Sequence, residues 1–226
     1  GTTFTDECGK TVTAHGDVCT KTEVKQLGTA SAYFDGAGDY LSLADSEDFK
    51  FGAEDFTIDF WFNFSDLSAG KTLIAKHVSG VYDEYYFALI QKQLYFVATT
   101  NGISWDITLD KNIETLTINQ WYHIAIVRNG NVFTMYLDGT SVATTTVSGS
   151  IKAGNNDLLI GIQPNNLGPY KGYIDELRIS KGIARWTSDF TPPTSQYVLN
   201  SRPVVHGLAV TFDGAPSATP ILDDMS

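Results

Sequence analysis

Two adjacent carboxylates stand inside the segment 172–186, GYIDELRISKGIARW, which otherwise has the pattern of a strand. Isoleucine and leucine recur through the segment, and the Asp175–Glu176 pair interrupts their alternation. Carboxylates held at fixed positions can coordinate a cation such as calcium or pair with arginine. Asp175 therefore has two candidate roles, as a cation ligand or as the partner of Arg178 or Arg185.

The sequence contains none of the common patterns that carry catalysis. It has no Gly-x-Ser-x-Gly turn for a nucleophile and no His-Glu-x-x-His helix for a catalytic zinc. Its histidines are dispersed, and its two cysteines are too few for a structural zinc site. The sequence thus predicts a protein that is not an enzyme.

Aromatic and amide side chains gather in three segments that have the composition of loops, 77–86, 100–106 and 162–172. Aromatic rings stack on the C–H faces of sugars and amides bind their hydroxyls, so this combination predicts a carbohydrate site. At each aromatic position the alternative, a ring that packs in the core, stays open. The candidate ligand-binding residues are Tyr82, Tyr85, Asn101, Trp105, Asn165, Asn166 and Tyr170.

Short strands are the elements that must position these loops. Asn-Gly, Asp-Gly and similar turn signals separate short segments rich in Val, Ile, Thr, Tyr and Phe. The clearest local prediction is a three-stranded meander over 121–147. Its first strand is apolar on both faces, which predicts a central strand with His123 as a structural histidine. The whole pattern predicts an all-β fold, a sandwich of two antiparallel sheets.

Length and charge limit the remaining possibilities. A chain of 226 residues can form one large β-domain, predicted over 1–194 with an N-terminal hairpin or loop (1–28) packed on it, followed by a C-terminal arm or linker (195–226). A net charge of −11 with scattered Lys and Arg argues against a nucleic-acid partner. No apolar run is long enough to span a membrane, so no membrane insertion is expected. Cys8 and Cys19 either form a small disulfide loop or remain thiols.

Four segments stand in succession along the chain: ASAYFDGAGDYLSLADSEDFKFGAEDFTIDFWF (30–62), QWYHIAIVRNGN (120–131), MYLDGT (135–140) and GYIDELRISKGIARW (172–186). Together they resemble laminin-G-like domains of the concanavalin A-like lectin/glucanase (jelly-roll) superfamily, of the type found in phage and bacterial surface proteins. The resemblance extends from about residue 28 to about residue 193 and implies a two-sheet antiparallel jelly roll.

The resemblance also implies a structural calcium at the edge of the sandwich, where an early loop meets the last strand. Matched to this sequence, its ligands are Asp35 and Asp39 from the loop FDGAGDY together with Asp175. The alternative is that Asp35 forms a turn and Asp175 an ion pair. Hydrolases of the superfamily carry a Glu-x-Asp-x-Glu strand, and the nearest strand here offers Asp59 alone.

Two functions from different classes follow from these observations. The first is a non-catalytic, lectin-like adhesion module, stabilised by calcium, that binds carbohydrate on a cell or particle surface. The second is a structural decoration or attachment protein of a virion, such as a bacteriophage tail or capsid surface. In that case the arm 195–226 contacts other protein subunits. Both place the protein outside the cell or on a virion surface.

Overall fold

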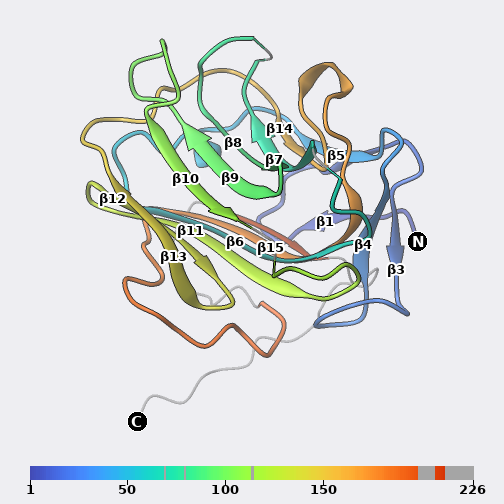
Figure 1. Cartoon of the computed structure of the whole chain (residues 1–226). Coiled ribbons are helices and arrows are strands. Elements are labelled where there is room, and N and C mark those ends of the chain that lie inside the picture. The colour runs from blue at the N-terminus through green and yellow to red at the C-terminus, as the bar shows by residue number, and fades with distance from the viewer. Residues whose placement is uncertain (69, 79, 113–114, 198–206, 212–226) are drawn as a thin grey trace.

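The computed structural model describes residues 1–68, 70–78, 80–112, 115–197 and 207–211. Two antiparallel sheets lie face to face in this part of the chain (Figure 1). Sheet A has the order β1-β16-β15-β6-β11-β12-β13, with β4 paired to β15 and β3 to β4. Sheet B has the order β10-β9-β8-β7-β14-β5-β2. The arrangement is the all-β jelly-roll sandwich that the sequence predicts.

The bounds of the elements are as follows. Sheet A contains β1 (Thr5–Asp6), β3 (Cys19–Lys21), β4 (Ser31–Asp35), β6 (Phe56–Phe64), β11 (Tyr122–Asn129), β12 (Val132–Leu137), β13 (Thr140–Thr146), β15 (Lys171–Lys181) and β16 (Gly207–Thr211). Sheet B contains β2 (Thr13–His15), β5 (Tyr40–Leu43), β7 (Lys71–Lys76), β8 (Tyr85–Ile90), β9 (Gln93–Ala98), β10 (Ile107–Asn112) and β14 (Leu158–Ile160). Two short 3-10 helices, η1 (Glu47–Phe49) and η2 (Pro164–Asn166), lie between strands.

The hydrophobic core lies between the sheets, and β6 forms its centre on the side of sheet A. Alternate residues of this strand point into the core and are at most 2% exposed; they are Phe56, Ile58, Phe60, Phe62 and Phe64. Full burial of such a side chain contributes about 1.5–3 kcal/mol of transfer free energy. The intervening residues point to the outer face of sheet A, where other segments cover them.

The predicted meander is confirmed as β11, β12 and β13. Asn129 pairs with Val132 across the first turn, in which Gly130 has a φ of 60°. Asp138 and Gly139 form the second turn with φ values of 49° and 77°. These are left-handed angles, which Asn, Asp and Gly tolerate at low cost, and this explains why the turns were readable from sequence.

A β-bulge in β15 explains the acidic pair. The pairing with β6 shifts register between Asp175 and Arg178, and Glu176 has a φ of 50°. The extra residue keeps both carboxylates out of the core while Leu177 is buried in it. The interrupted alternation in the sequence is therefore the signature of this bulge.

Strands β7 and β10 were not expected from sequence, because their polar residues hide the alternation. Of the predicted arm, the structure describes 195–197 and 207–211, and the other residues of the segment lie outside the described ranges. The backbone of β16 pairs with β15 and with β1. Within the described ranges, no helix has the length and apolar character needed to cross a membrane.

Candidate binding site on the outer side of sheet B

A pocket of about 260 Å³ lies on the outer side of sheet B, and we call it the aromatic pocket. Its walls come from the three loops that the sequence singled out and from β8, and Figure 1 shows the loops projecting on the same side of the molecule. The volume lies just below the range of pockets for drug-sized ligands, so it suits one small ring-sized unit. The lining residues are His77, Gly80, Val81, Tyr82, Tyr86, Trp105 and Gln163.

Trp105 is the centre of the aromatic wall. Its ring lies 5.4 Å from Tyr82, 5.3 Å from Tyr86 and 5.9 Å from His77, measured between centroids. The interplanar angles are 71–88°, so all three contacts are edge to face, the favoured geometry for aromatic pairs. Tyr86 also contacts Tyr95 of β9 at 6.4 Å. Aromatic surface therefore continues from the pocket along the sheet.

Large apolar side chains exposed to solvent gather around the pocket. Of seven such side chains among the described residues, five lie on the same three loops; they are Val78, Val81, Tyr82, Ile103 and Leu167. Ile103 is 77% exposed. Scattered exposed apolar residues need no explanation, but their concentration at one place marks an interaction surface.

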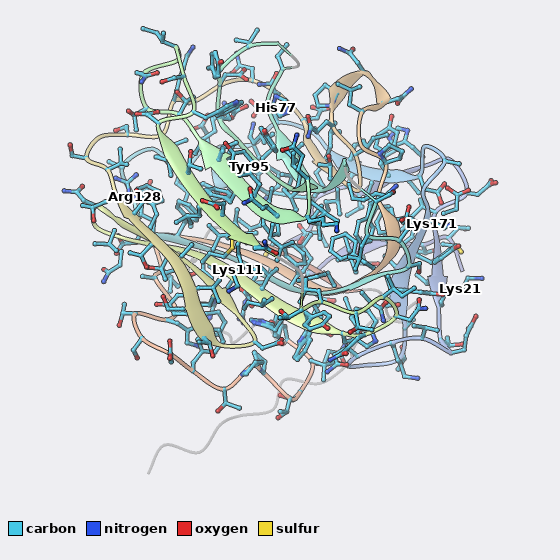
Figure 2. All side chains as sticks on the ribbon, in the orientation of Figure 1. Lys21, His77, Tyr95, Lys111, Arg128 and Lys171 are labelled. Carbon is cyan, nitrogen blue, oxygen red and sulfur yellow. The ribbon has the colours of Figure 1, made fainter. Side chains whose placement is uncertain are left out.

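His77 directly follows β7 and lines the aromatic pocket; Figure 2 labels it on the side of the molecule from which the loops project. Its Nδ1 lies 2.9 Å from the carbonyl oxygen of Val78. The N–H of Val78 donates to Asp83 at 2.9 Å, and Asp83 accepts a second bond from the Asn156 amide at 2.9 Å. His77 is 6% exposed, and its Nε2 has no hydrogen-bond partner among the described residues.

A buried ionic group anchors the loop beneath the pocket. Lys76 is completely buried and contacts Glu84 at 2.8 Å, Asp45 at 2.7 Å and the carbonyl oxygen of Asn156 at 2.6 Å. Burial opposes the charge of Asp45, but hydrogen bonds from Lys50 and Lys76 lower the pKa of its carboxyl. This network links Lys76 and Glu84, which stand before and after the loop that follows β7.

The loop 100–106 is held by its own side chains. Asp106 accepts a hydrogen bond from the N–H of Thr100 at 2.7 Å, and Asn101 accepts bonds from the N–H groups of Ile103 and Ser104 at 2.7 and 3.0 Å. Asn101 is thus exposed but committed to the turn that presents Trp105.

The predicted ligand-binding residues divide into three groups. Tyr82 and Trp105 line the aromatic pocket. Asn101, Asn165 and Asn166 are exposed on the loops beside it, the last two with left-handed φ values of 63° and 57°.

The prediction is wrong for Tyr85 and Tyr170, because both rings are in the core. Tyr85 is 1% exposed and donates to the carbonyl of Phe49, and Tyr170 is 0% exposed and donates to the carbonyl of Asn63. Burial raises the pKa of both phenols.

Sequence reasoning missed His77, Tyr86 and Gln163 as pocket residues. His77 lay inside a segment already singled out, and its position directly after a strand was the available signal. Tyr86 could have been assigned from the alternation of YYFALI, in which Tyr85 and Phe87 face the core. Gln163 carried no signal.

The predicted calcium ligands Asp35 and Asp39 are held by backbone groups. Asp39 accepts hydrogen bonds from the N–H groups of Asp17 and Asp35, at 2.6 and 2.9 Å. Asp35 accepts one from Ala37 at 2.6 Å, which forms the alternative predicted from sequence, a turn. Burial, together with repulsion from the neighbouring carboxylates, raises the pKa of Asp39.

Asp175 lies elsewhere on the same strand pair. Asp35 pairs with Lys171, and Asp175 is four residues further along β15, a separation of about 13 Å in an extended strand. Its carboxylate accepts hydrogen bonds from the N–H groups of Gln26 and Leu27 at 2.8 and 3.0 Å. In the part of the chain that the structure describes, no group of three or more His, Cys, Asp or Glu is placed to hold a metal. The predicted ligand set is therefore wrong, and calcium binding as such stays a prediction.

The outer face of sheet A carries a charged group that the sequence analysis did not identify. Asp59 is completely buried and accepts hydrogen bonds from the Nε and Nη2 atoms of Arg178 at 3.0 and 2.8 Å. His123 lies 3.7 Å from the same carboxylate. Burial opposes the charge, but the contacts with His123 and Arg178 hold the pKa of Asp59 below its ordinary value. Asp59 is a structural counter-ion, and His123 is the structural histidine that the sequence predicts.

The segment that follows β15 covers this face (Figure 1, orange, beneath sheet A). The rings of Trp186 and Phe190 stack at 3.9 Å, and both contact His123 edge to face. The hydroxyl of Tyr197 bonds to Nε2 of His123 at 3.1 Å, and its N–H donates to Glu176. The two acids of the bulge thus each accept hydrogen bonds from a segment outside the strands: Asp175 from the segment between β3 and β4, and Glu176 from the segment after β15.

Cys8 and Cys19 are not joined by a disulfide bond. Cys8 is exposed and Cys19 is half-buried in β3. Of the two alternatives left open by the sequence, the structure has the thiols.

The sequence and the fold were both compared with those of known proteins. The family described as the concanavalin A-like lectin/glucanases superfamily matches residues 35–185. No curated protein shows significant sequence similarity to the chain.

Solved structures with the same fold come from several kinds of protein. Domain 4 of AbnA, an extracellular arabinanase of Geobacillus stearothermophilus in complex with arabinotriose, has a TM-score of 0.56 and 18% identity, covering 76% of this chain and 81% of that one. The binding domain of botulinum neurotoxin serotype D has a TM-score of 0.59 and 13% identity, covering 81% of this chain. Domains LG4-5 of the mouse laminin alpha1 chain have a TM-score of 0.55 and 18% identity, covering 75% and 47%. The chain spans only 44% of the neurotoxin binding domain.

Proposed function

The chain belongs to the concanavalin A-like lectin/glucanases superfamily, and we propose that it is a non-catalytic module that binds carbohydrate at the surface of a cell or particle. The observation that carries this proposal is the aromatic pocket. Trp105, Tyr82 and Tyr86 line it together, and exposed apolar side chains surround it. Aromatic rings that are partly exposed and fixed by edge contacts offer flat surfaces to the C–H faces of a sugar ring.

Two further points support a saccharide over another ligand. The pocket has room for one small ring and carries polar atoms from His77 and Gln163 beside the aromatic wall. Among the structural neighbours, domain 4 of AbnA is part of an extracellular arabinanase, and its structure holds arabinotriose. Because that neighbour shares the fold with this chain, it supports a saccharide as the class of ligand. The position proposed for the site rests on the aromatic pocket alone.

The lining of the pocket supports binding without catalysis. Retaining and inverting glycoside hydrolases need two carboxyl groups on either side of the scissile bond. Among the described residues that line the pocket, none is an acid. The nearby Asp83 is engaged by Val78 and Asn156.

The test is binding of the purified chain to an array of neutral and acidic oligosaccharides, with arabinotriose as the first single compound measured by calorimetry. We expect Trp105→Ala to weaken binding by at least about 10-fold, since a central aromatic contact is typically a dominant one. Trp121→Ala is the matched control, because Trp121 is also half-buried but lies against Tyr173 on sheet A. Equal binding by both variants and the unchanged chain would place the site elsewhere.

The second function predicted from sequence, a structural or attachment protein of a virion, stays a prediction. So does the contact of the arm 195–226 with other protein subunits. A blank array together with stable self-association or capture of a particle would favour that function over the one proposed here.

A further inference from the structure

We propose that His77 selects the ligand by accepting a hydrogen bond from one hydroxyl of a neutral saccharide in the aromatic pocket. The inference rests on the proposed function and names a residue and a chemical class for the same site. Its basis is the buried, unpartnered Nε2 of His77, a residue that lines the pocket.

The tautomer of His77 follows from its other nitrogen. Nδ1 lies 2.9 Å from the carbonyl oxygen of Val78, and a carbonyl oxygen can only accept. Nδ1 therefore carries the proton and donates it. In the neutral ring Nε2 is then left as an acceptor with a free lone pair.

A chain of hydrogen bonds fixes the orientation of this ring. Asn156 donates to Asp83 at 2.9 Å, Asp83 accepts from the N–H of Val78 at 2.9 Å, and the carbonyl of Val78 accepts from His77. The rings of Tyr86 and Trp105 pack against the imidazole at 5.1 and 5.9 Å. Because ring flips would break these contacts, the acceptor keeps its position in the wall.

A buried acceptor without a partner is energetically unfavourable, so a hydroxyl that reaches it gains a hydrogen bond that the free protein lacks. His77 is only 6% exposed, so a ligand must displace part of the wall to reach Nε2. Tyr82 is 41% exposed and is the most exposed ring of the pocket, so it is the ring that can turn with the smallest loss of buried contacts. Rotamer changes of this kind are common when a ligand binds.

The same chemistry disfavours a carboxylate or sulfate group placed against His77. An acceptor nitrogen needs a donor, and at neutral pH a carboxylate or sulfate has no proton to give. The carboxylate of Asp83, behind Val78, and the net charge of −11 add repulsion. Neutral hexoses and pentoses, which present several hydroxyl donors on one ring, fit these requirements.

The experiment uses methyl glycosides of neutral hexoses and pentoses, with a monodeoxy series of the tightest binder. For the unchanged chain, we expect removal of one particular hydroxyl to weaken binding about 5-fold, the effect of one lost hydrogen bond. In His77→Ala the parent sugar should bind about 5-fold more weakly, and that deoxy analogue should lose nothing further. His77→Gln, which keeps an acceptor and most of the volume, should retain part of the discrimination.

The control is His15→Ala, because His15 lies in the same sheet and its Nε2 already has a partner, the hydroxyl of Ser42 at 2.8 Å. It should leave the deoxy profile unchanged. The inference would be overturned if removal of that hydroxyl weakened binding equally in the unchanged chain and in His77→Ala. It would also be overturned if no deoxy analogue bound the unchanged chain more weakly than the parent sugar. In both cases sensitivity to Trp105→Ala would keep the proposed function standing. Absence of any saccharide binding by the unchanged chain would instead remove the proposed function itself.

Discussion

The outer faces of the two sheets both carry histidine and aromatic side chains, but these are covered on sheet A and open to a pocket on sheet B. On sheet A, Asp59, Arg178 and His123 are hydrogen-bonded and lie beneath Trp186 and Phe190. On sheet B, aromatic rings and a histidine line a pocket with exposed apolar side chains around it. Residue composition therefore does not distinguish the covered face from the open one, and the segment that covers sheet A does.

Unpartnered nitrogens occur on both faces, and their surroundings differ. Nδ1 of His123 also has no hydrogen-bond partner among the described residues. His123 is 0% exposed, however, and three aromatic rings pack against it at 5.2–5.8 Å. His77, by contrast, lines the aromatic pocket, and we propose that a ligand there supplies the bond that its Nε2 lacks.

The largest effect is expected from a substitution of Asp59, which tests whether the two faces are independent. We expect Asp59→Asn to lower the free energy of unfolding by about 3 kcal/mol, because it leaves Arg178 without its buried counter-ion. Urea denaturation at neutral pH measures this change. The matched control is Asp66→Asn, which removes a half-exposed partner of Lys71 and should lower stability by less than about 1 kcal/mol. A loss of saccharide binding in Asp59→Asn, at a temperature where the variant is folded, would contradict the separation of the two faces.

A second prediction compares two tryptophans. Trp186→Ala should lower the free energy of unfolding by about 2 kcal/mol, less than for a fully buried ring, because Trp186 is half-buried and stacks on Phe190. Saccharide affinity should not change. Trp105→Ala should do the reverse, with a large loss of affinity and a smaller loss of stability. Thermal melts and calorimetry on the same two preparations test the contrast, which fails if both variants lose affinity equally.

The third prediction concerns pH. The folded-state pKa of Asp59 is lower than that of an unfolded aspartate, so its contribution to stability is fully present above about pH 4. The contribution disappears as pH falls through the lower folded-state value. The stability difference between the unchanged chain and Asp59→Asn should therefore be constant from pH 7 to 5 and shrink below about pH 4. Urea titrations at several pH values measure it, and a difference that grows in acid would show that the sign is wrong.

The smallest effect is expected from removal of calcium. Asp39 and Asp175 each accept two backbone hydrogen bonds, and the two carboxylates are held at separate places on the fold. We therefore expect a chelator to leave the melting temperature unchanged. A fall of several degrees, reversed by added calcium, would show that the predicted calcium exists with ligands other than the set Asp35, Asp39 and Asp175.

The sequence by itself determined the class of fold, the meander and the loops that carry the pocket. These follow from local rules, because strand alternation and left-handed turn residues act over a few positions. The strands β6 and β8 and the turn at Asn129–Gly130 show this, since their bounds were readable from the printed letters.

Only the tertiary structure decided which side chains of those loops reach the pocket. Tyr85 and Tyr86 are neighbours, yet one is 1% exposed in the core and the other lines the pocket, because alternate residues of a strand face opposite sides. The hydrogen bonds from the backbone N–H groups of Gln26 and Leu27 to Asp175 join residues almost 150 positions apart. The sealing of sheet A also depends on long-range packing, by Trp186, Phe190 and Tyr197. Such contacts depend on the path of the whole chain, and no local pattern in the sequence encodes them.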